Sequence, residues 1–186
     1  MDGKWRVTRS QTLIKDRWIH LRADDCVTPD GVVIAPYYVL ECPDWVHVVA
    51  LTDDDEVVLV REYRHAMGDF CLGLPAGVVD AGDADPEQAA RRELKEEAGF
   101  EAREWRRVAR LQAEPARQGN WIHVFLARGL TGGLDRGLEP GEEGMSVELR
   151  PLSEVLAGLA DGVLPQATIV GSLTLALGAA GRLRLE

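Results

Sequence analysis

The segment from residue 77 to residue 100 constrains this chain more than any other part of its sequence, because a glycine-containing loop leads there into a strongly marked helix. Asp85 is a suitable N-cap, Pro86 suits the first helical position, and Gln88 stands three residues after the cap, as a capping box requires. Gly99 is a typical C′ residue, where the chain leaves the helix. The sequence therefore predicts a helix that begins at Pro86 and ends just before Gly99.

Three glutamates crowd one side of this predicted helix. Glu93, Glu96 and Glu97 are spaced by three and four residues, which places their carboxylates on one face and costs a few tenths of a kcal/mol per pair in water. A hard divalent cation would offset this repulsion, because Mg²⁺ is usually held by one or two carboxylates together with waters and substrate phosphates. A separate apolar stripe should pack against the body of the domain, and it consists of Ala90, Leu94 and Ala98.

A glutamate-rich helix face can also be an ordinary solvated surface, because Glu87–Arg91 and Arg92–Glu96 are common i,i+4 ion pairs. Joined to the preceding loop, however, the helix resembles the Nudix box. The pattern of that box is Gly, five residues, Glu, seven residues, and then Arg-Glu-aliphatic-x-Glu-Glu-x-Gly-aliphatic. Residues 92–99 fit its second half fully. The chain is identified by this resemblance as a member of the Nudix hydrolases.

The first half of the box departs from the pattern. Gly77 stands one residue too far from Arg92, and the usual loop glutamate is replaced by Ala84, which Asp83 and Asp85 flank. One extra residue in the loop is easily absorbed, because it precedes the helix that carries the carboxylates.

Segments outside the box narrow the resemblance to ADP-ribose pyrophosphatases and related nucleoside diphosphate sugar hydrolases. Residues 60–65 and 74–77 are similar to segments that precede the box in this group, Pro115 falls at its characteristic proline, and residues 164–169 resemble its closing helix. The likeness covers about residues 18–178.

Two further departures concern the substrate. Gly73 stands where the group usually has Glu, and residues 116–121 replace a Gly followed by a Ser-Asn or Ser-Asp-Glu element. The second of these loops would lie near the sugar or terminal ribose.

The resemblance implies a set of site residues. The metal, Mg²⁺ or Mn²⁺, would be held by the backbone carbonyl of Ala76 and the carboxylates of Glu93, Glu96 and Glu97. Arg92 would orient these carboxylates. The general base would come from the loop before the last strand, where Glu143 is the closest match and Glu142 the next, although either could be a solvated acid. Contacts to the substrate would come from Arg64, Trp18, Tyr37, Val78 and Arg117.

Some of these substrate contacts have other interpretations. Arg64 could be an exposed charge at a strand end. Trp18 and Tyr37 could stack on the nucleobase, but aromatic residues at amphipathic strand spacing are more often core or interface residues.

Composition limits the possible partners. The chain has 186 residues and a net charge of −10, without a marked Lys/Arg cluster, which argues against a large nucleic-acid surface. No apolar run is long enough to span a membrane, and the first residues do not resemble a signal peptide. Cys26, Cys42 and Cys71 are scattered and odd in number, as is typical of reduced thiols in a cytoplasmic protein.

The order of expected elements predicts a mixed α/β sandwich, the architecture that the resemblance also implies, preceded by a small N-terminal antiparallel sheet. Residues 1–43 would form this sheet region and residues 44–186 the hydrolase domain. Expected strands cover residues 46–51 and 56–63, joined as a hairpin, and residues 105–112, 121–127 and 147–149. A loop is expected over residues 129–144, and helices over residues 153–160 and 167–179. An apolar N-terminal sheet must bury its face against something, which favours a homodimer.

The sequence therefore predicts a Mg²⁺-dependent pyrophosphohydrolase that cleaves ADP-ribose or a similar nucleoside diphosphate sugar to a nucleoside monophosphate and a sugar phosphate. Alternatives are a Nudix hydrolase of another substrate (a GDP-sugar, a dinucleotide or a nucleoside triphosphate) and a Nudix-like binding module that has lost turnover.

Overall fold

The computed structural model describes residues 3–133, 137 and 144–183, and the chain forms two compact units. The N-terminal unit comprises Met1–Pro43 together with Gln112–Trp121, and the core unit comprises Asp44–Leu111 together with Ile122–Glu186. The chain therefore leaves the core unit once in mid-sequence, between two strands, to contribute a ten-residue segment to the N-terminal unit.

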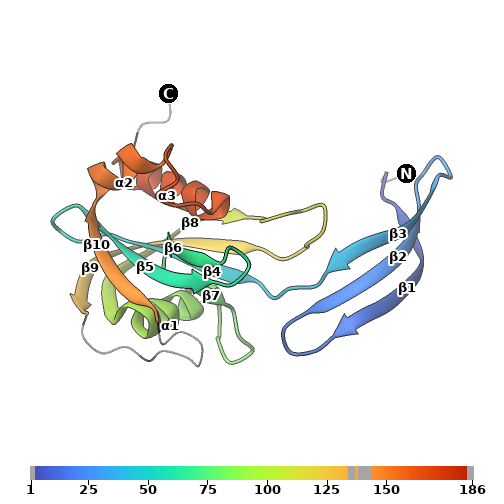
Figure 1. Ribbon diagram of the computed structural model, residues 1–186, viewed down its shortest axis with the longest axis horizontal. Coiled ribbons are helices and arrows are strands. Elements are labelled where there is room, and N and C mark those ends of the chain that lie inside the picture. The colour runs from blue at the N-terminus through green and yellow to red at the C-terminus, as the bar shows by residue number, and fades with distance from the viewer. Residues whose placement is uncertain (1–2, 134–136, 138–143, 184–186) are drawn as a thin grey trace. The chain divides into compact units, whose positions relative to one another are not determined.

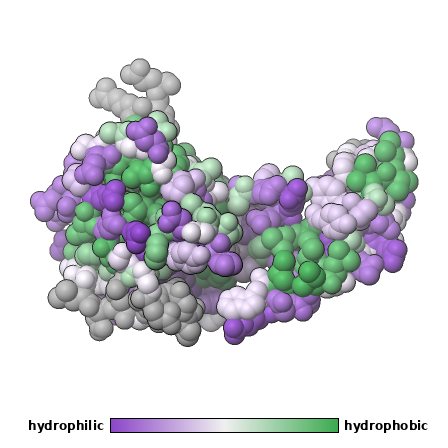
Figure 2. Space-filling view, in the orientation of Figure 1, coloured by the Kyte–Doolittle hydropathy of each residue, from purple (hydrophilic) through white to green (hydrophobic). Residues whose placement is uncertain are grey.

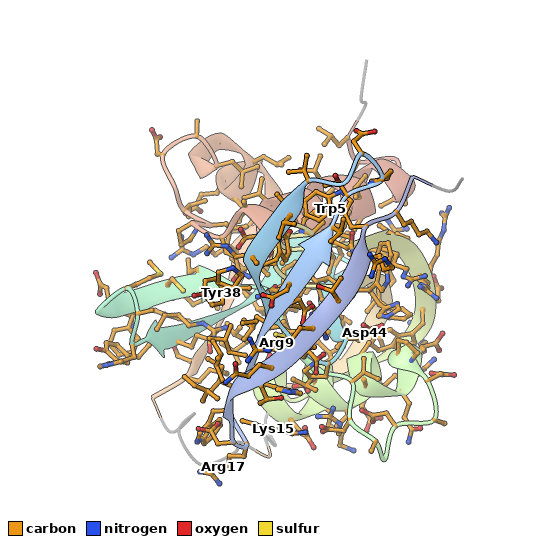
Figure 3. The ribbon with its side chains drawn as sticks, turned by 90° about the vertical axis from the view of Figure 1, so that its right-hand side faces the viewer. Trp5, Arg9, Lys15, Arg17, Tyr38 and Asp44 are labelled. Carbon is orange, nitrogen blue, oxygen red and sulfur yellow. The ribbon has the colours of Figure 1, made fainter. Side chains whose placement is uncertain are left out.

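The N-terminal unit is a three-stranded antiparallel sheet in the order β1-β2-β3, formed by β1 (Arg6–Lys15), β2 (His20–Val27) and β3 (Val33–Leu40) (Figure 3). All ten residues of the edge strand β1 are exposed. On the other edge, the inserted segment binds β3, because the Leu40 N–H donates to the Arg117 carbonyl over 2.9 Å. The expected N-terminal sheet is confirmed.

The core unit contains two sheets. The first is mixed, in the order β7-β4-β9-β8, with β4 and β9 parallel and the other pairs antiparallel. The second is antiparallel, in the order β10-β5-β6. The strands are β4 (Trp45–Ala50), β5 (Glu56–Arg64), β6 (Asp69–Gly73), β7 (Ala76–Val78), β8 (Phe100–Leu111), β9 (Ile122–Gly132) and β10 (Ser146–Pro151).

Helices cover both sides of the strands, which completes the expected α/β/α sandwich (Figure 1). Helix α1 (Pro86–Ala98) packs on one side, around a cluster that includes Val46, Val58, Leu94 and Phe125. Helices α2 (Leu152–Gly158) and α3 (Ala167–Ala179) pack on the other, around a cluster whose members include Val49, Leu59 and Leu173. Alternate residues of β4 and β5 enter the two clusters, which explains why both strands are almost continuously apolar.

The structure corrects one part of the expected topology. Strands β4 and β5 do not form a hairpin ladder, because they belong to different sheets and meet only at an isolated bridge between Leu51 and Val57. The two edges of β4 are already filled by β7 and β9. Strands β6 and β7 were not expected, and β9 extends to Gly132, inside the expected 129–144 loop.

Helices α1 and α3 occupy the expected positions, and within the described residues no helix is long and apolar enough to cross a bilayer.

Candidate functional site

Helix α1 begins and ends as its local sequence predicts. The Asp85 carboxylate accepts a hydrogen bond of 2.9 Å from the Gln88 N–H, and Gly99 has a φ of 74°. The Gln88 side chain reaches back to the N–H of Ala84 over 2.7 Å, one residue before the cap. The loop is thereby fixed to the first turn of the helix, and the three glutamates follow in its second half.

The glutamate face of α1 is not an ordinary solvated surface. Glu93 is only 8% exposed and Glu97 only 5%, whereas the Glu96 side chain is about one-third exposed. Burying a carboxylate is costly unless it is paired or hydrogen-bonded. The N–H of Ala76, at the start of β7, donates to Glu97 Oε2 over 2.9 Å, which ties the helix to this short strand.

Gly77 provides the space for the second buried carboxylate. A Cβ built on Gly77 would lie 2.1 Å from Glu93 Oε1, far inside van der Waals contact. The backbone of β7 therefore approaches the Glu93 carboxylate so closely that any larger residue at position 77 would require this carboxylate to move. Ala76 and Gly77, which the sequence could relate to the helix only by likeness to a family, lie against two of its three glutamates.

Arg92 links the loop to the glutamates. Its Nη1 donates to Glu93 Oε1 over 2.7 Å and to Glu96 Oε2 over 3.0 Å. Its Nη2 donates to the Val78 carbonyl over 2.9 Å and to Asp83 Oδ2 over 3.1 Å. The hydrogen bond with Asp83 raises the pKa of Arg92 above its usual value and lowers the pKa of the Asp83 carboxyl. The guanidinium thus stays charged between two groups of acids.

Asp83 is the site residue that sequence reasoning missed. Counting backward from Arg92 placed Ala84 at the loop position of the box, but counting forward five residues from Gly77 places Asp83 there. The structure agrees with the second count, because the Asp83 side chain is only 5% exposed and pairs with Arg92. The extra residue of the box therefore lies between Asp83 and the start of the Arg-Glu segment.

The donor set fits a hard divalent cation. Three carboxylates lie within two helical turns, two of them buried against β7, and carboxylate oxygens are what Mg²⁺ prefers. Among the described residues, no group of three or more His, Cys, Asp or Glu side chains is already placed to hold a metal ion. Glu93 and Glu96 are bonded to Arg92 instead, and Mg²⁺ usually takes waters and substrate phosphates as further ligands beside one or two carboxylates. Glu142 and Glu143, the candidates for the general base, fall outside the described residues.

Arg64 and Arg61 belong to the same strand but to opposite faces of its sheet. Leu59 belongs to the α2/α3 cluster and Val58 to the α1 cluster, so strand alternation assigns Arg64 to the α1 side and Arg61 to the other. Arg64 pairs with Glu62, and Arg61 lies 4.0 Å from the centre of the Phe70 ring. The alternation therefore favours Arg64 over Arg61 as a residue of the carboxylate side.

Val78 lies at the end of β7 in the core unit, and the three remaining candidate substrate residues lie in the N-terminal unit. Trp18 is 78% exposed in the turn after β1, and the Arg17 guanidinium stacks 4.1 Å from the centre of its ring. The Tyr37 ring packs edge-on against Trp5 with 5.9 Å between centroids, and its hydroxyl donates to the Ala116 carbonyl. Arg117 is mostly exposed beside Glu114, with 3.7 Å between the charged atoms. Tyr37 thus anchors the inserted segment to the sheet.

The chain is similar to two protein families and to a solved structure. The sequence matches the profile of the NUDIX domain over residues 43–169 and that of the nucleoside diphosphate sugar hydrolase N-terminal domain over residues 5–40. A crystal structure of an ADP compounds hydrolase is similar with a TM-score of 0.84 and 27% identity, over 97% of each chain.

Two curated proteins are similar over shorter stretches. An ADP-ribose pyrophosphatase of Mycobacterium tuberculosis is 34% identical over 121 residues, which are 65% of this chain and 58% of that protein. A methanol dehydrogenase activator of Bacillus methanolicus is 28% identical over 126 residues, which are 68% of this chain and 67% of that protein. The matched region therefore spans less than two thirds of the pyrophosphatase.

Proposed function

Since the chain belongs to the Nudix family, we propose that it is a Mg²⁺-dependent hydrolase that cleaves the diphosphate of ADP-ribose or a similar nucleoside diphosphate sugar. The products would be a nucleoside monophosphate and a sugar phosphate. The observation that carries the proposal is the burial of Glu93 and Glu97 against β7, because these carboxylates and Glu96, at like-charge spacing, carry more negative charge than the guanidinium of Arg92 alone offsets.

The proposed chemistry assigns a role to each group. Mg²⁺, or Mn²⁺ in its place, would be held by the carbonyl of Ala76 and by Glu93, Glu96 and Glu97; when bound, it would neutralise charge on the diphosphate oxygens and lower the pKa of a water. Arg92 orients Glu93 and Glu96 through its Nη1. Glu143 or Glu142 would take the proton of the attacking water as general base.

The substrate class is proposed from two sources. The profile matched by residues 5–40 is named for nucleoside diphosphate sugar hydrolases, and the matched pyrophosphatase and the ADP compounds hydrolase are named for ADP-containing substrates. We assign Arg64, Val78 and Arg117 to contacts with the substrate and Trp18 and Tyr37 to the neighbourhood of its base. For Tyr37 the contact would involve the ring, because its hydroxyl is already bonded to Ala116.

The test is a panel of nucleoside diphosphate derivatives, assayed for release of nucleoside monophosphate with Mg²⁺ and with excess EDTA. We expect turnover of ADP-ribose that EDTA abolishes. Glu97→Gln should lower kcat by at least about a hundredfold, the usual cost of removing one preorganised electrostatic group from an active site. The fold should survive, because the amide oxygen of Gln can still accept the Ala76 N–H.

Other outcomes of the panel would favour the alternatives. Turnover confined to a GDP-sugar, a dinucleotide or a nucleoside triphosphate keeps the chemistry and changes the substrate. Tight binding of ADP-ribose with no release of monophosphate from any compound would indicate a binding module. Activity in EDTA close to the Mg²⁺ rate, or a fully active Glu97→Gln protein, would contradict the metal site itself.

A further inference from the structure

We propose that the guanidinium of Arg92 competes with the metal for Glu93 and Glu96. Asp83 would hold this guanidinium at a position from which it can move away from the two glutamates when the metal binds. This inference rests on the proposed metal site. It concerns two residues of the loop–helix junction and predicts opposite effects for their substitution.

The guanidinium of Arg92 has two edges with different partners. Nη1 faces the helix and contacts Glu93 Oε1 at 2.7 Å and Glu96 Oε2 at 3.0 Å. Nε and Nη2 face the loop and contact Asp83 at 3.4 Å and 3.1 Å, and Nη2 also contacts the Val78 carbonyl at 2.9 Å. One planar cation therefore spans the metal-ligand candidates and the loop.

Competition follows from charge. Glu93 Oε1 and Glu96 Oε2 are among the oxygens that would bind a divalent cation, and Nη1 already lies within hydrogen-bonding distance of both. A dication on these oxygens would stand a few Å from a permanent positive charge, in a site where Glu93 is mostly buried and water screens poorly. Binding of the metal must therefore weaken the bonds from Nη1 or pull the guanidinium toward the loop.

The loop provides a rigid place for the displaced charge. The Asp83 side chain is only 5% exposed, and two hydrogen bonds hold it in place: the Asp83 N–H donates to the Asp80 carbonyl at 3.0 Å, and Asp83 Oδ2 accepts from the Asp80 N–H at 2.9 Å. A second carboxylate oxygen, Asp80 Oδ2, lies 3.4 Å from Nη2 of Arg92. The negative charge of Asp83 lowers the cost of keeping Arg92 beside a dication, so Asp83 should favour metal binding without touching the metal.

The experiment is titration of the full chain with Mn²⁺ by isothermal calorimetry at pH 8, where carboxylates are ionised. Arg92→Met should bind Mn²⁺ more tightly than wild type, by roughly the tenfold that one charge-assisted hydrogen bond represents. Asp83→Asn should bind it more weakly by a similar factor. Arg92→Gln carries the same expectation as Arg92→Met and keeps a polar side chain on the helix, should the methionine variant fail to fold.

Two control variants remove one positive and one negative charge at other positions in the chain. Arg91→Met removes the neighbouring arginine of α1, which instead pairs with Glu87 at 2.7 Å. Asp54→Asn removes an exposed acid from the turn between β4 and β5. Both controls should match wild type in Mn²⁺ affinity.

The possible results separate this inference from the proposed function. Weaker Mn²⁺ binding by both the Arg92 and the Asp83 variants would overturn the competition and leave Arg92 as a purely supporting residue, with the metal site intact. If Arg91→Met and Arg92→Met gained Mn²⁺ affinity equally, the gain would come from net charge alone, and the proposed competition would also be overturned. No Mn²⁺ binding by wild type would remove the metal site, and this inference with it.

Discussion

Gly77 shows how the absence of one methyl group can determine the position of a buried carboxylate. Its backbone touches the buried Glu93 carboxylate so closely that a Cβ would overlap Oε1 at 2.1 Å. The requirement is one of space, and it couples the start of the box to the helix through direct contact. At the scale of a single residue, the position of the Glu93 carboxylate therefore depends on the missing side chain of Gly77.

We expect Gly77→Ala to lower the free energy of unfolding by about 1–3 kcal/mol, the usual cost of overpacking, and to weaken Mn²⁺ binding because Glu93 must move. Chemical denaturation and calorimetry measure the two effects. Gly73→Ala is the matched control for stability, because a Cβ there meets nothing within 4 Å. A Gly77→Ala protein with the stability and Mn²⁺ affinity of wild type would show that Glu93 does not need its observed position.

At the scale of elements, a buried histidine joins a central strand to the last helix. His47 on β4 is 1% exposed, and its Nδ1 lies 2.9 Å from the hydroxyl of Ser172 on α3. Burial lowers the pKa of His47 to about 4, from 6.5. The protonated imidazole is therefore strongly disfavoured in the folded core unit, whereas in the unfolded chain His47 titrates with its usual pKa of 6.5.

The sign of the resulting pH dependence follows from linkage. Between pH 6.5 and pH 4 the unfolded state binds more protons than the folded state, so the contribution of His47 is fully present above pH 6.5 and is lost as the pH falls toward 4. The whole loss amounts to roughly 3 kcal/mol, since each unit of pKa shift corresponds to 1.36 kcal/mol.

Urea denaturation of wild type and His47→Gln between pH 4 and pH 7.5 tests this expectation. The variant should have lower stability at pH 7.5 but a flatter decline below pH 6.5, because it lacks the group that titrates. Carboxylates such as Asp83, whose pKa is lowered, contribute equally to both proteins, so the difference between the curves isolates the histidine. Parallel curves over this range would mean that His47 does not set the slope.

At the scale of the whole molecule, the N-terminal unit leaves much apolar surface exposed (Figure 2). Strand β1 is an edge strand exposed along its entire length, and Trp18 and Val33 are 78% and 67% exposed. A long exposed edge strand with apolar side chains tends to associate with another chain. We therefore propose a homodimer in which residues 5–43 contribute to the interface and to the partner's substrate pocket.

Light scattering at micromolar concentration should give twice the mass of the 20.4 kDa chain. Val33→Glu should shift the protein toward monomer by placing a charge in the interface, whereas Leu149→Glu, on an exposed position of the core unit, should not. A monomeric wild-type protein would count decisively against this assembly.

The inserted segment 112–121 also bears on substrate choice at this scale. Its backbone is held to the N-terminal sheet through the Arg117 and Ala116 carbonyls. Ala116 and Gly119 offer no side-chain hydrogen bond to a substrate, although Arg117 and Gln118 carry donors. We expect ADP-glucose, GDP-mannose and UDP-glucose to be cleaved with kcat/KM within about a hundredfold of ADP-ribose, because a pocket without paired polar groups discriminates weakly. Side-by-side kinetics decide this, and a much larger preference for ADP-ribose would contradict it.

The sequence by itself determined the elements whose signals are local. Helix α1 occupies the expected residues because its cap, its first-turn proline and its final glycine act on neighbouring backbone groups. The N-terminal strands and α3 follow from hydrophobic periodicity and turn residues in the same way. The carboxylate set on α1 could be proposed for the same reason, since helical spacing alone places Glu93, Glu96 and Glu97 on one face.

Only the tertiary structure decided which distant groups meet. It separated β4 from β5, although they adjoin in sequence, because β4 is already paired on both edges. It also identified Asp83 as the partner of Arg92, where two counts of the box disagreed, and it buried Glu93 against Gly77. Strand pairing and the burial of charge depend on contacts between residues far apart in the chain, whose free energies no local pattern contains.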